Sequence, residues 1–253
     1  MLIELAPGEV HVWYSLTAQF DMMQVDADLE VLSPDERARY GRLRFEGGRR
    51  DYAAAHALLR TSLSRYADVS PLEWTFHTLA AGKPVLHPET CRPILTFNLS
   101  HTSGLVACVI AGGPDVGIDV ESVDRTVEPG VAERFFSARE NDALRRLEPA
   151  ARGRRFIDLW TLKESYLKAT GEGVSSSLSG VVFEVDESGG VDFTPPPGID
   201  PAAWCFTLFA PTDHHRLAVA VRLDGARAAI TMRPAPDPLR ARAARTERTR
   251  RRR

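Results

Sequence analysis

The sequence predicts an α+β protein made of two similar halves, residues 1–115 and 116–232, that pack together and precede a basic tail at 233–253. The main observation is a repeat. Each half has a long helical segment, a strand with aromatic residues, a glycine-containing turn and a strand of small apolar residues. The closing strands read LVACVIA at 105–111 and RLAVAVRL at 216–223. In addition, 253 residues with 43% hydrophobic content suffice for a substantial buried core, so a site at the junction of the halves is expected.

The N-terminal half is expected to open with strands and continue with two helices. Ser33, Pro34 and Glu36 form the pattern of an N-cap, a first-turn proline and a capping box, so a helix should begin there. Gly47 and Gly48 interrupt it before a longer amphipathic helix. In chain order, the predicted elements are strands at 2–6 and 10–16, helices at 33–45 and 49–66, and strands at 74–77, 93–100 and 104–110.

The C-terminal half is expected to open with the second arm of a hairpin, after a turn at residues 112–115. Ser137 with Glu140 three residues on is a second capping-box pattern. In chain order, the predicted elements are a strand at 116–121, helices at 131–136, 137–147 and 156–170, and strands at 180–186, 191–194, 203–210 and 215–223.

The net charge of −2 is unevenly distributed. From Arg233 onward there are nine arginines and two acidic residues, which is +7, so residues 1–232 carry −2 minus 7, or −9. The Pro/Ala/Arg-rich tail is predicted to be flexible and solvated. Binding of nucleic acid through this tail is an alternative, but the acidic body would repel a polyanion.

The cysteines and the hydropathy pattern predict a cytoplasmic protein. Cys91, Cys108 and Cys205 are odd in number and far apart, and the last two lie in apolar runs, which favours reduced thiols. No apolar run is long enough to span a bilayer, and the N-terminus lacks a signal-peptide pattern.

Residues 156–173 contain a helix with an unusual concentration of charge. Trp160, Lys163, Glu164 and Lys168 fall on one stripe, while a second, apolar stripe can face a core. This pattern is typical of a functional helix face. The alternative is that Glu164 and Lys168 form an ordinary surface ion pair at i, i+4.

Two acidic residues upstream favour the functional interpretation. Asp119 and Glu121 are two apart in a predicted strand, so both side chains face the same side. Paired carboxylates repel each other unless a cation neutralises them, and Mg²⁺ prefers carboxylates together with phosphate oxygens. Gly117 permits a close approach of another backbone. The alternative is a solvated strand edge.

Other polar residues are candidate phosphate ligands. Ser100 and His101 end a strand without a G-x-S-x-G elbow, and Lys83 lies in a turn before Pro84. A basic cluster precedes them. It indicates either a binding site for a phosphorylated small molecule or a solvated helix face. It consists of Arg37, Arg39, Arg42, Arg44, Arg49 and Arg50. Walker A, G-x-G-x-x-G and zinc-ligand patterns are absent from the sequence.

Five motifs in a fixed order carry a family resemblance. They are GKP at 82–84, FNLSHT at 97–102, GIDVE at 117–121, FFSARE at 135–140 and WTLKESYLKATGEG at 160–173. Together they resemble the Sfp-type 4′-phosphopantetheinyl transferases over about residues 1–223. The resemblance implies two similar α+β halves with coenzyme A between them. It also implies a monomeric, Mg²⁺-dependent enzyme that transfers phosphopantetheine from coenzyme A to a serine of a carrier protein and releases adenosine 3′,5′-bisphosphate.

The resemblance also assigns roles to individual residues. Asp119, Glu121 and Glu164 are the implied Mg²⁺ ligands, and Glu164 is also the implied general base, acting directly or through a water. Lys163 and Lys168 are candidates to stabilise charge on the phosphates or the leaving group. On the helix after Arg39, Arg50 is the nearest basic residue, but Asp51 is an alternative match. The positions implied to contact coenzyme A are Arg39, Arg50, Lys83, Pro84, Ser100, His101, Asp119 and Lys168.

Two alternatives to the transferase remain open from the sequence alone, and so does the class of the carrier. The chain could bind coenzyme A without catalysis, although all three acidic positions are present, or it could bind nucleic acid through its tail. The carrier could belong to fatty-acid, polyketide, nonribosomal-peptide or lysine-pathway systems, with the resemblance favouring secondary metabolism. The loop at 122–129 and the helix with Phe135 and Phe136 are expected to contact the carrier.

Overall fold

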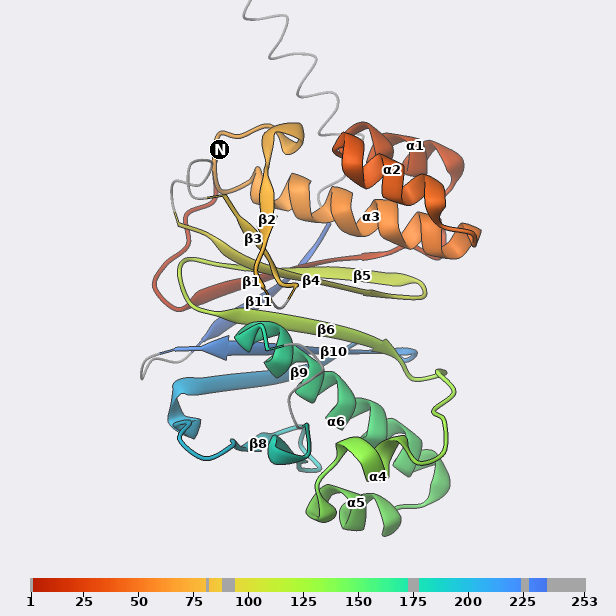
Figure 1. Cartoon of the computed structure of the whole chain (residues 1–253), viewed down its shortest axis with the longest axis vertical. Helices are drawn as coiled ribbons and strands as arrows, with labels where there is room; N and C mark the ends of the chain where they lie inside the picture. The colour runs from red at the N-terminus through yellow and green to blue at the C-terminus, as the bar shows by residue number, and fades with distance from the viewer. Residues whose placement is uncertain (1, 81, 88–93, 173–177, 224–227, 236–253) are drawn as a thin grey trace, which may run out of the picture.

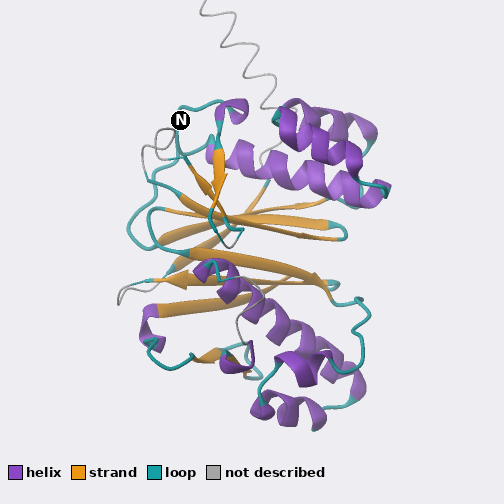
Figure 2. Ribbon diagram, viewed as in Figure 1, coloured by secondary structure: helices purple, strands orange, loops and turns teal. Residues whose placement is uncertain are grey.

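Two β-sheets lie face to face at the centre of the molecule, and helices cover the outer face of each (Figure 1, Figure 2). The computed structural model describes residues 2–80, 82–87, 94–172, 178–223 and 228–235. The N-terminal half contains β1 (Glu9–Leu16), α1 (Met22–Glu30), α2 (Pro34–Arg42), α3 (Glu46–Leu63), β2 (Phe76–Thr78), β3 (Pro84–Leu86), β4 (Thr96–Thr102) and β5 (Leu105–Ala111). After it come β6 (Val116–Ser122), α4 (Val131–Phe135), α5 (Ala138–Arg145), α6 (Pro149–Thr170), β7 (Val182–Val185), β8 (Val191–Thr194), β9 (Trp204–Thr212), β10 (His215–Arg222) and β11 (Ala229–Pro234).

The two halves repeat one topology, which confirms the predicted duplication. In each, a first strand leads to a long helix, α3 or α6, then a small hairpin, β2–β3 or β7–β8, and then an antiparallel pair. The strand order is β1-β5-β4 in the first sheet and β6-β10-β9 in the second, so the last strand always lies between the other two. In the repeat β6 corresponds to β1 and β4 to β9, and the edge strands β4 and β6 lie next to each other where the two sheets meet.

The central layer between the sheets is built from small and β-branched side chains. Val12 of β1 and Val109 of β5 face Ile118 of β6 and Val219 of β10, all of them fully buried. A second core packs α3 on the first sheet, and a third packs α6 on the second. The third core holds most of the aromatic contacts, including a stacked pair of Phe136 and Phe156. This four-layer arrangement buries both faces of each sheet.

The last described strand corrects the predicted domain boundaries. Strand β11 returns to the first sheet and pairs in parallel with β1, with Arg233 opposite Trp13. Residues 229–232 therefore belong to the N-terminal sheet, and Arg233 and Pro234 complete a strand instead of starting a tail. Three contacts hold this strand in place: the Arg233 guanidinium lies 5.7 Å from the Trp13 ring centroid, its Nη2 lies 3.1 Å from His11 Nε2, and Ala235 N donates to Tyr14 O.

Other predicted elements differ in their bounds. Residues 2–6 form no strand, α1 was not predicted, and α6 begins at Pro149, seven residues before its expected start. Cys91 and the tail residues 236–253 lie outside the described residues, whereas Cys108 is a buried free thiol and Cys205 is a half-buried one. No helix in the described parts of the chain is long and apolar enough to cross a membrane.

Strand β6 and helix α6 pack backbone against backbone at Gly117. A Cβ atom at this position would overlap Ser165 O and Ala169 N of α6. The close approach expected at this glycine is therefore made by a helix. It holds the strand that carries Asp119 and Glu121 against the helix that carries Glu164 and Lys168.

We expect Gly117→Ala to destabilise the protein by about 3 kcal/mol or more, because neither backbone can move without breaking a core. Gly153→Ala is the matched control, since a Cβ at Gly153 of α6 meets nothing within 4 Å and alanine favours helix. Urea unfolding of both variants measures the effect. Equal stabilities for the two would contradict the packing described here.

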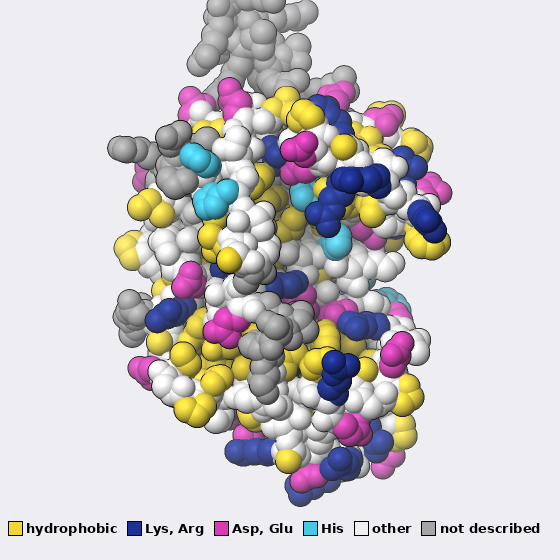
Figure 3. Space-filling model, in the orientation of Figure 1, with side chains coloured by type: hydrophobic (Ala, Val, Ile, Leu, Met, Phe, Trp, Pro, Cys, Tyr) yellow, Lys and Arg dark blue, Asp and Glu magenta, His cyan; other side chains and the backbone are white. Residues whose placement is uncertain are grey.

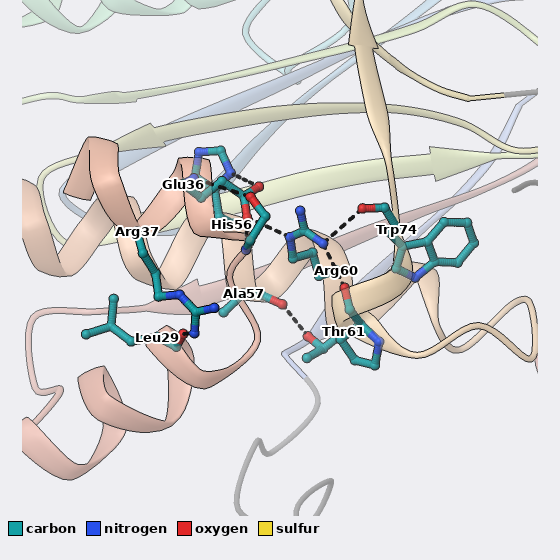
Figure 4. A network of polar contacts seen from close by, with 10 residues as sticks. Leu29, Glu36, Arg37, His56, Ala57, Arg60, Thr61 and Trp74 are labelled. Carbon is teal, nitrogen blue, oxygen red and sulfur yellow. Dashed lines mark hydrogen bonds and ion pairs between the residues drawn. The ribbon is translucent and has the colours of Figure 1, made fainter. Parts of the chain in front are cut away.

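Helix α2 is fixed to α3 by one carboxylate (Figure 4). The predicted N-cap is confirmed: Ser33 Oγ accepts from Glu36 N at 3.3 Å, and Glu36 Oε2 accepts from Ser33 N at 2.7 Å. Glu36 also accepts from Arg60 Nε at 2.8 Å and pairs with His56 Nδ1 at 3.0 Å. Arg60 in turn donates to Trp74 O. Burial opposes these contacts, but the hydrogen bonds prevail and lower the pKa of Glu36 from 4.5 to about 2.

Because its folded pKa is depressed, Glu36 stabilises the protein fully above pH 4.5, and this contribution is lost as the pH falls toward 2. The difference in pKa corresponds to about 3 kcal/mol at neutral pH. Glu36→Gln should therefore cost more stability at pH 7 than at pH 3, by about 2 kcal/mol. Denaturant unfolding at both pH values measures this, with exposed Asp35→Asn as the control. A Glu36→Gln effect independent of pH would refute the assignment.

Candidate active site at the junction of the two sheets

Side chains of β4 connect the two sheets where their edges meet. Asn98 Oδ1 accepts a hydrogen bond from Ile118 N of β6 at 3.1 Å, and Ser100 Oγ accepts one from Val120 N at 3.3 Å. These side chains satisfy backbone donors that have no neighbouring strand on that side. Both are buried, so the junction is a polar seam inside an apolar core.

Three predicted site residues meet on this seam from three different elements. Lys168 of α6 donates to Asp119 Oδ1 of β6 at 2.6 Å and to Ser100 Oγ of β4 at 2.9 Å. Ser100 Oγ also donates to Asp119 Oδ1 at 3.0 Å. Asp119 is only 5% exposed, whereas 29% of the Lys168 side chain is accessible. The pair is therefore a buried carboxylate with a cation that a ligand can reach.

Two further carboxylates share the electrostatic environment of Asp119. Burial and then the charge of Asp119 raise the pKa of Glu121 to about 7, and Glu164 adds to this shift. The pKa of Glu164 is raised by the same two causes, in the same order. The charge of Asp119 therefore acts on two further carboxylates, one from β6 and one from α6.

Carboxylate oxygens are the ligands that a hard divalent cation prefers, although the three carboxylates are not arranged around one common point. Asp119 Oδ2 is buried and has no hydrogen-bond partner among the described residues. Glu121 is paired with Arg125, whose guanidinium lies 5.4 Å from the centre of the Trp160 ring. Within the described ranges, no three His, Cys, Asp or Glu side chains are already gathered for metal binding. A cation would relieve the repulsion and use the free oxygen of Asp119, but the three carboxylates would have to converge on it.

Lys83 and His101 flank the seam from the N-terminal half. Lys83 Nζ donates to Ala169 O at 2.7 Å and to Val116 O at 3.4 Å, so it joins the β2–β3 hairpin to the end of α6. Burial lowers its pKa. Pro84 is exposed beside it. Desolvation lowers the pKa of His101; the charge of Asp51 opposes this shift and that of Lys168 adds to it. The residue itself is exposed.

The basic residues Arg39 and Arg50 lie on the helical layer of the N-terminal half. Arg39 is exposed in the last turn of α2. Arg50 Nε lies 3.6 Å from Asp51 Oδ1, and it is buried without a hydrogen-bond partner among the described residues. Asp51 is itself buried and accepts a hydrogen bond from Thr17, so it is directed into the fold. This turn of α3 thus offers two basic groups, Arg50 beside Asp51 and Arg49, whose guanidinium lies 4.6 Å from the Tyr40 ring centroid. Figure 3 shows Lys and Arg side chains on both sides of the waist between the sheets, with acidic and histidine side chains between them.

Lys163 does not belong to the site, so its predicted catalytic role is wrong. Its ammonium is fully buried, pairs with Glu140 Oε2 at 2.9 Å, and donates to Leu178 O and Val181 O. It also lies 5.2 Å from the Phe136 ring centroid. Adjacent helical residues point about 100° apart, so Lys163 can face this inner layer while Glu164 faces the seam. Lys163 fastens α5 and the segment from Leu178 to Val181 to α6.

Lys163→Met should cost about 3–5 kcal/mol of stability, because it leaves Glu140 buried without its partner. The double variant with Glu140→Gln should recover part of this loss. Neither change should alter the turnover number per folded molecule. Unfolding curves and active-site-normalised rates separate the two effects, and a fall of kcat in the stable double variant would restore Lys163 to the mechanism.

Two residues of the junction were missed by sequence reasoning. Asn98 lies in the quoted FNLSHT motif, and the signal available was a polar side chain within an otherwise apolar strand. Arg125 lies in a loop with no periodicity, so its contact with Glu121 depends on the tertiary fold alone.

Comparisons with known proteins identify a family to which this chain is similar. Residues 115–221 match the 4′-phosphopantetheinyl transferase superfamily. The chain is 34% identical over 227 residues to the 4′-phosphopantetheinyl transferase HetI of Nostoc sp., covering 87% of this chain and 90% of that protein. It is 28% identical to the 4′-phosphopantetheinyl transferase Sfp of Bacillus subtilis, over 68% and 75% of the two chains. The crystal structure of Thermotoga maritima holo-[acyl-carrier-protein] synthase aligns with a TM-score of 0.36 at 25% identity, covering 44% of this chain and 64% of that one.

Proposed function

The chain belongs to the 4′-phosphopantetheinyl transferase superfamily, and from this premise we propose that it transfers the phosphopantetheine arm of coenzyme A to a carrier-protein serine, releasing adenosine 3′,5′-bisphosphate. The observation that carries the proposal is the polar seam at the sheet junction. There, Lys168 and Ser100 meet Asp119, and two more carboxylates lie within electrostatic reach.

Asp119, Glu121 and Glu164 are the residues that would hold Mg²⁺. When bound, Mg²⁺ would neutralise charge on the pyrophosphate of coenzyme A. The unpartnered Oδ2 of Asp119 and the raised pKa of Glu121 support this assignment. Arg125 now pairs with Glu121, so we expect this guanidinium to be released when the carboxylate takes a new partner.

Glu164 is the proposed general base. The carrier serine oxygen attacks the β-phosphorus of coenzyme A, the bond to the bridging oxygen of the nucleotide breaks, and the serine proton passes to Glu164 directly or through a water. The raised pKa of Glu164 makes it a better proton acceptor than an ordinary carboxylate. Adenosine 3′,5′-bisphosphate leaves with the electron pair of the broken bond.

Hydrogen-bond donors of the seam would stabilise the negative charge on the transferred group. Lys168 is partly accessible, and Lys83 and His101 flank it from the other half. Each offers a donor at or near the junction, where low solvent access strengthens its effect. For the nucleotide we propose Arg39 and Arg50 as phosphate ligands and Pro84 as a contact of the adenine.

The same proposal includes the cellular setting. Coenzyme A and carrier proteins fit a cytoplasmic monomer with reduced thiols, and burial raises the pKa of Cys108 to about 12, which keeps it inert. The physiological carrier class remains to be assigned by experiment, with secondary-metabolite carriers as our first choice.

Mass spectrometry of carrier proteins tests the function. A panel of apo-carriers of acyl, peptidyl and polyketide types is incubated with the chain, coenzyme A and Mg²⁺. We expect at least one carrier to gain the mass of phosphopantetheine at its serine, and the serine-to-alanine carrier to gain none. No gain on any carrier of the panel would contradict the proposal.

A further inference from the structure

A cavity of about 260 Å³ lies between α1, α3 and the end of β11, apart from the polar seam. Its apolar wall includes Phe20, Val31 and Leu58, and its polar wall includes Ser15, Gln24 and Asp28. None of these residues belongs to the proposed transferase machinery. A cavity of this volume is large enough for a small organic group rather than a single water.

Asp28 gives the cavity its chemistry. It is only 4% exposed, and Oδ1 accepts a hydrogen bond from Gln24 Nε2 at 3.2 Å. Oδ2 is buried with no partner among the described residues. Burial raises the pKa of Asp28 to about 7, because the surroundings solvate its charge poorly. A buried carboxylate with a free oxygen is unfavourable unless a donor is supplied from elsewhere.

Among the described residues, none donates a hydrogen bond to Asp28 Oδ2. The lining contains no Lys, Arg or His side chain. The hydroxyl of Thr61, which also lines the cavity, already donates to Ala57 O at 2.6 Å. Gln24 already uses its amide nitrogen on Oδ1. The cavity therefore combines an apolar wall with an acidic group that lacks a cation.

We propose that this cavity binds a positively charged nitrogen group, ammonium or guanidinium, carried on a short apolar stem. The stem packs on Phe20, Val31 and Leu58, and the charged head pairs with Asp28. A desolvated ion pair beside an apolar wall discriminates strongly against a neutral group of the same shape, because only the cation both donates a hydrogen bond and neutralises the buried carboxylate.

Two sources can supply this chemistry. One is a free amine or guanidine. The other is the chain itself, because Ala235 lines the cavity and the sequence that follows, residues 236–253, contains eight arginines. Tethering so close to a site would give such a side chain a high effective concentration. The chemistry is shared, and the experiment distinguishes the sources.

The test uses the full-length chain and NMR titration with butylguanidinium, butylammonium and neutral 1-butanol. Four forms are compared: the natural sequence, Asp28→Asn, a variant in which the eight arginines after Ala235 are glutamine, and this arginine-free variant with Asp28→Asn added. In the arginine-free variant, butylguanidinium should bind at least about 10-fold more tightly than butanol, and adding Asp28→Asn should remove this preference. Because Asn is nearly isosteric and uncharged, the fold and the transferase turnover should be unchanged.

The natural sequence then identifies the source. Weaker probe binding than in the arginine-free variant assigns the site to the chain's own arginines, and equal binding assigns it to a free cation. Either result supports the proposal. Equal affinity for butanol and butylguanidinium in the arginine-free variant overturns it, as does a cation preference that survives Asp28→Asn.

Discussion

Glu164→Gln is expected to lower kcat for phosphopantetheine transfer at least about 10³-fold, because it removes both the proposed base and one carboxylate of the metal site. The same change should leave the free energy of unfolding unchanged or raise it. In the folded protein, burial and the nearby charge of Asp119 oppose ionisation of Glu164, so a neutral amide relieves repulsion. Loss of activity without loss of stability separates a chemical role from a structural one.

Glu187→Gln is the matched control, since Glu187 is an exposed residue between β7 and β8. Steady-state rates on a carrier that is modified by the natural chain, together with urea unfolding, measure both variants. A Glu164→Gln enzyme within about threefold of the natural rate would remove this residue from the mechanism.

Lys168→Met should combine a large catalytic effect with a loss of stability. It removes the cation that pairs with Asp119 and contacts Ser100, and it leaves a buried carboxylate unpaired. We expect kcat/KM for coenzyme A to fall about 10²- to 10³-fold, which is typical for loss of one preorganised donor at a developing charge. The free energy of unfolding should fall by about 3 kcal/mol without Mg²⁺, and by less with it.

The dependence of this variant's stability on Mg²⁺ provides the check. If Lys168 pairs with Asp119 as described, saturating Mg²⁺ should stabilise Lys168→Met more than the natural chain, because the cation then balances a carboxylate that has lost its partner. Arg146→Met is the exposed control on α5's C-cap, and it should show neither effect. Equal stabilisation of Lys168→Met and the natural chain by Mg²⁺ would contradict the shared site.

Local sequence signals predicted the elements that position the site. The capping box at Ser33 marked the start of α2, the alternation around Asp119 marked β6, and the helical spacing of Glu164 and Lys168 marked α6. These patterns reflect short-range physics, namely capping and the periodicity of buried faces. The repeat of the two halves also followed from pattern alone.

The rest depended on contacts between distant segments. Lys163 lies on the border of the helical stripe that holds Glu164, and its contacts with Glu140, Leu178 and Val181 place its ammonium in the inner layer. Strand β11 has few strand signals, and its pairing with β1 spans more than two hundred residues of sequence. The periodicity of one segment cannot reveal which distant segment it contacts, because the contact depends on the sequences of both segments.

The most direct test of the account is the binding of Mn²⁺, as a spectroscopic substitute for Mg²⁺, measured by electron paramagnetic resonance without substrate turnover. The account predicts one site per natural chain. Affinity should fall at least about 10-fold in each of Asp119→Asn, Glu121→Gln and Glu164→Gln, and should be unchanged in Glu187→Gln. Natural affinity in any one of the three site variants would show that its carboxylate is not a ligand. Natural affinity in all three would show that the acidic groups of β6 and α6 do not form the metal site.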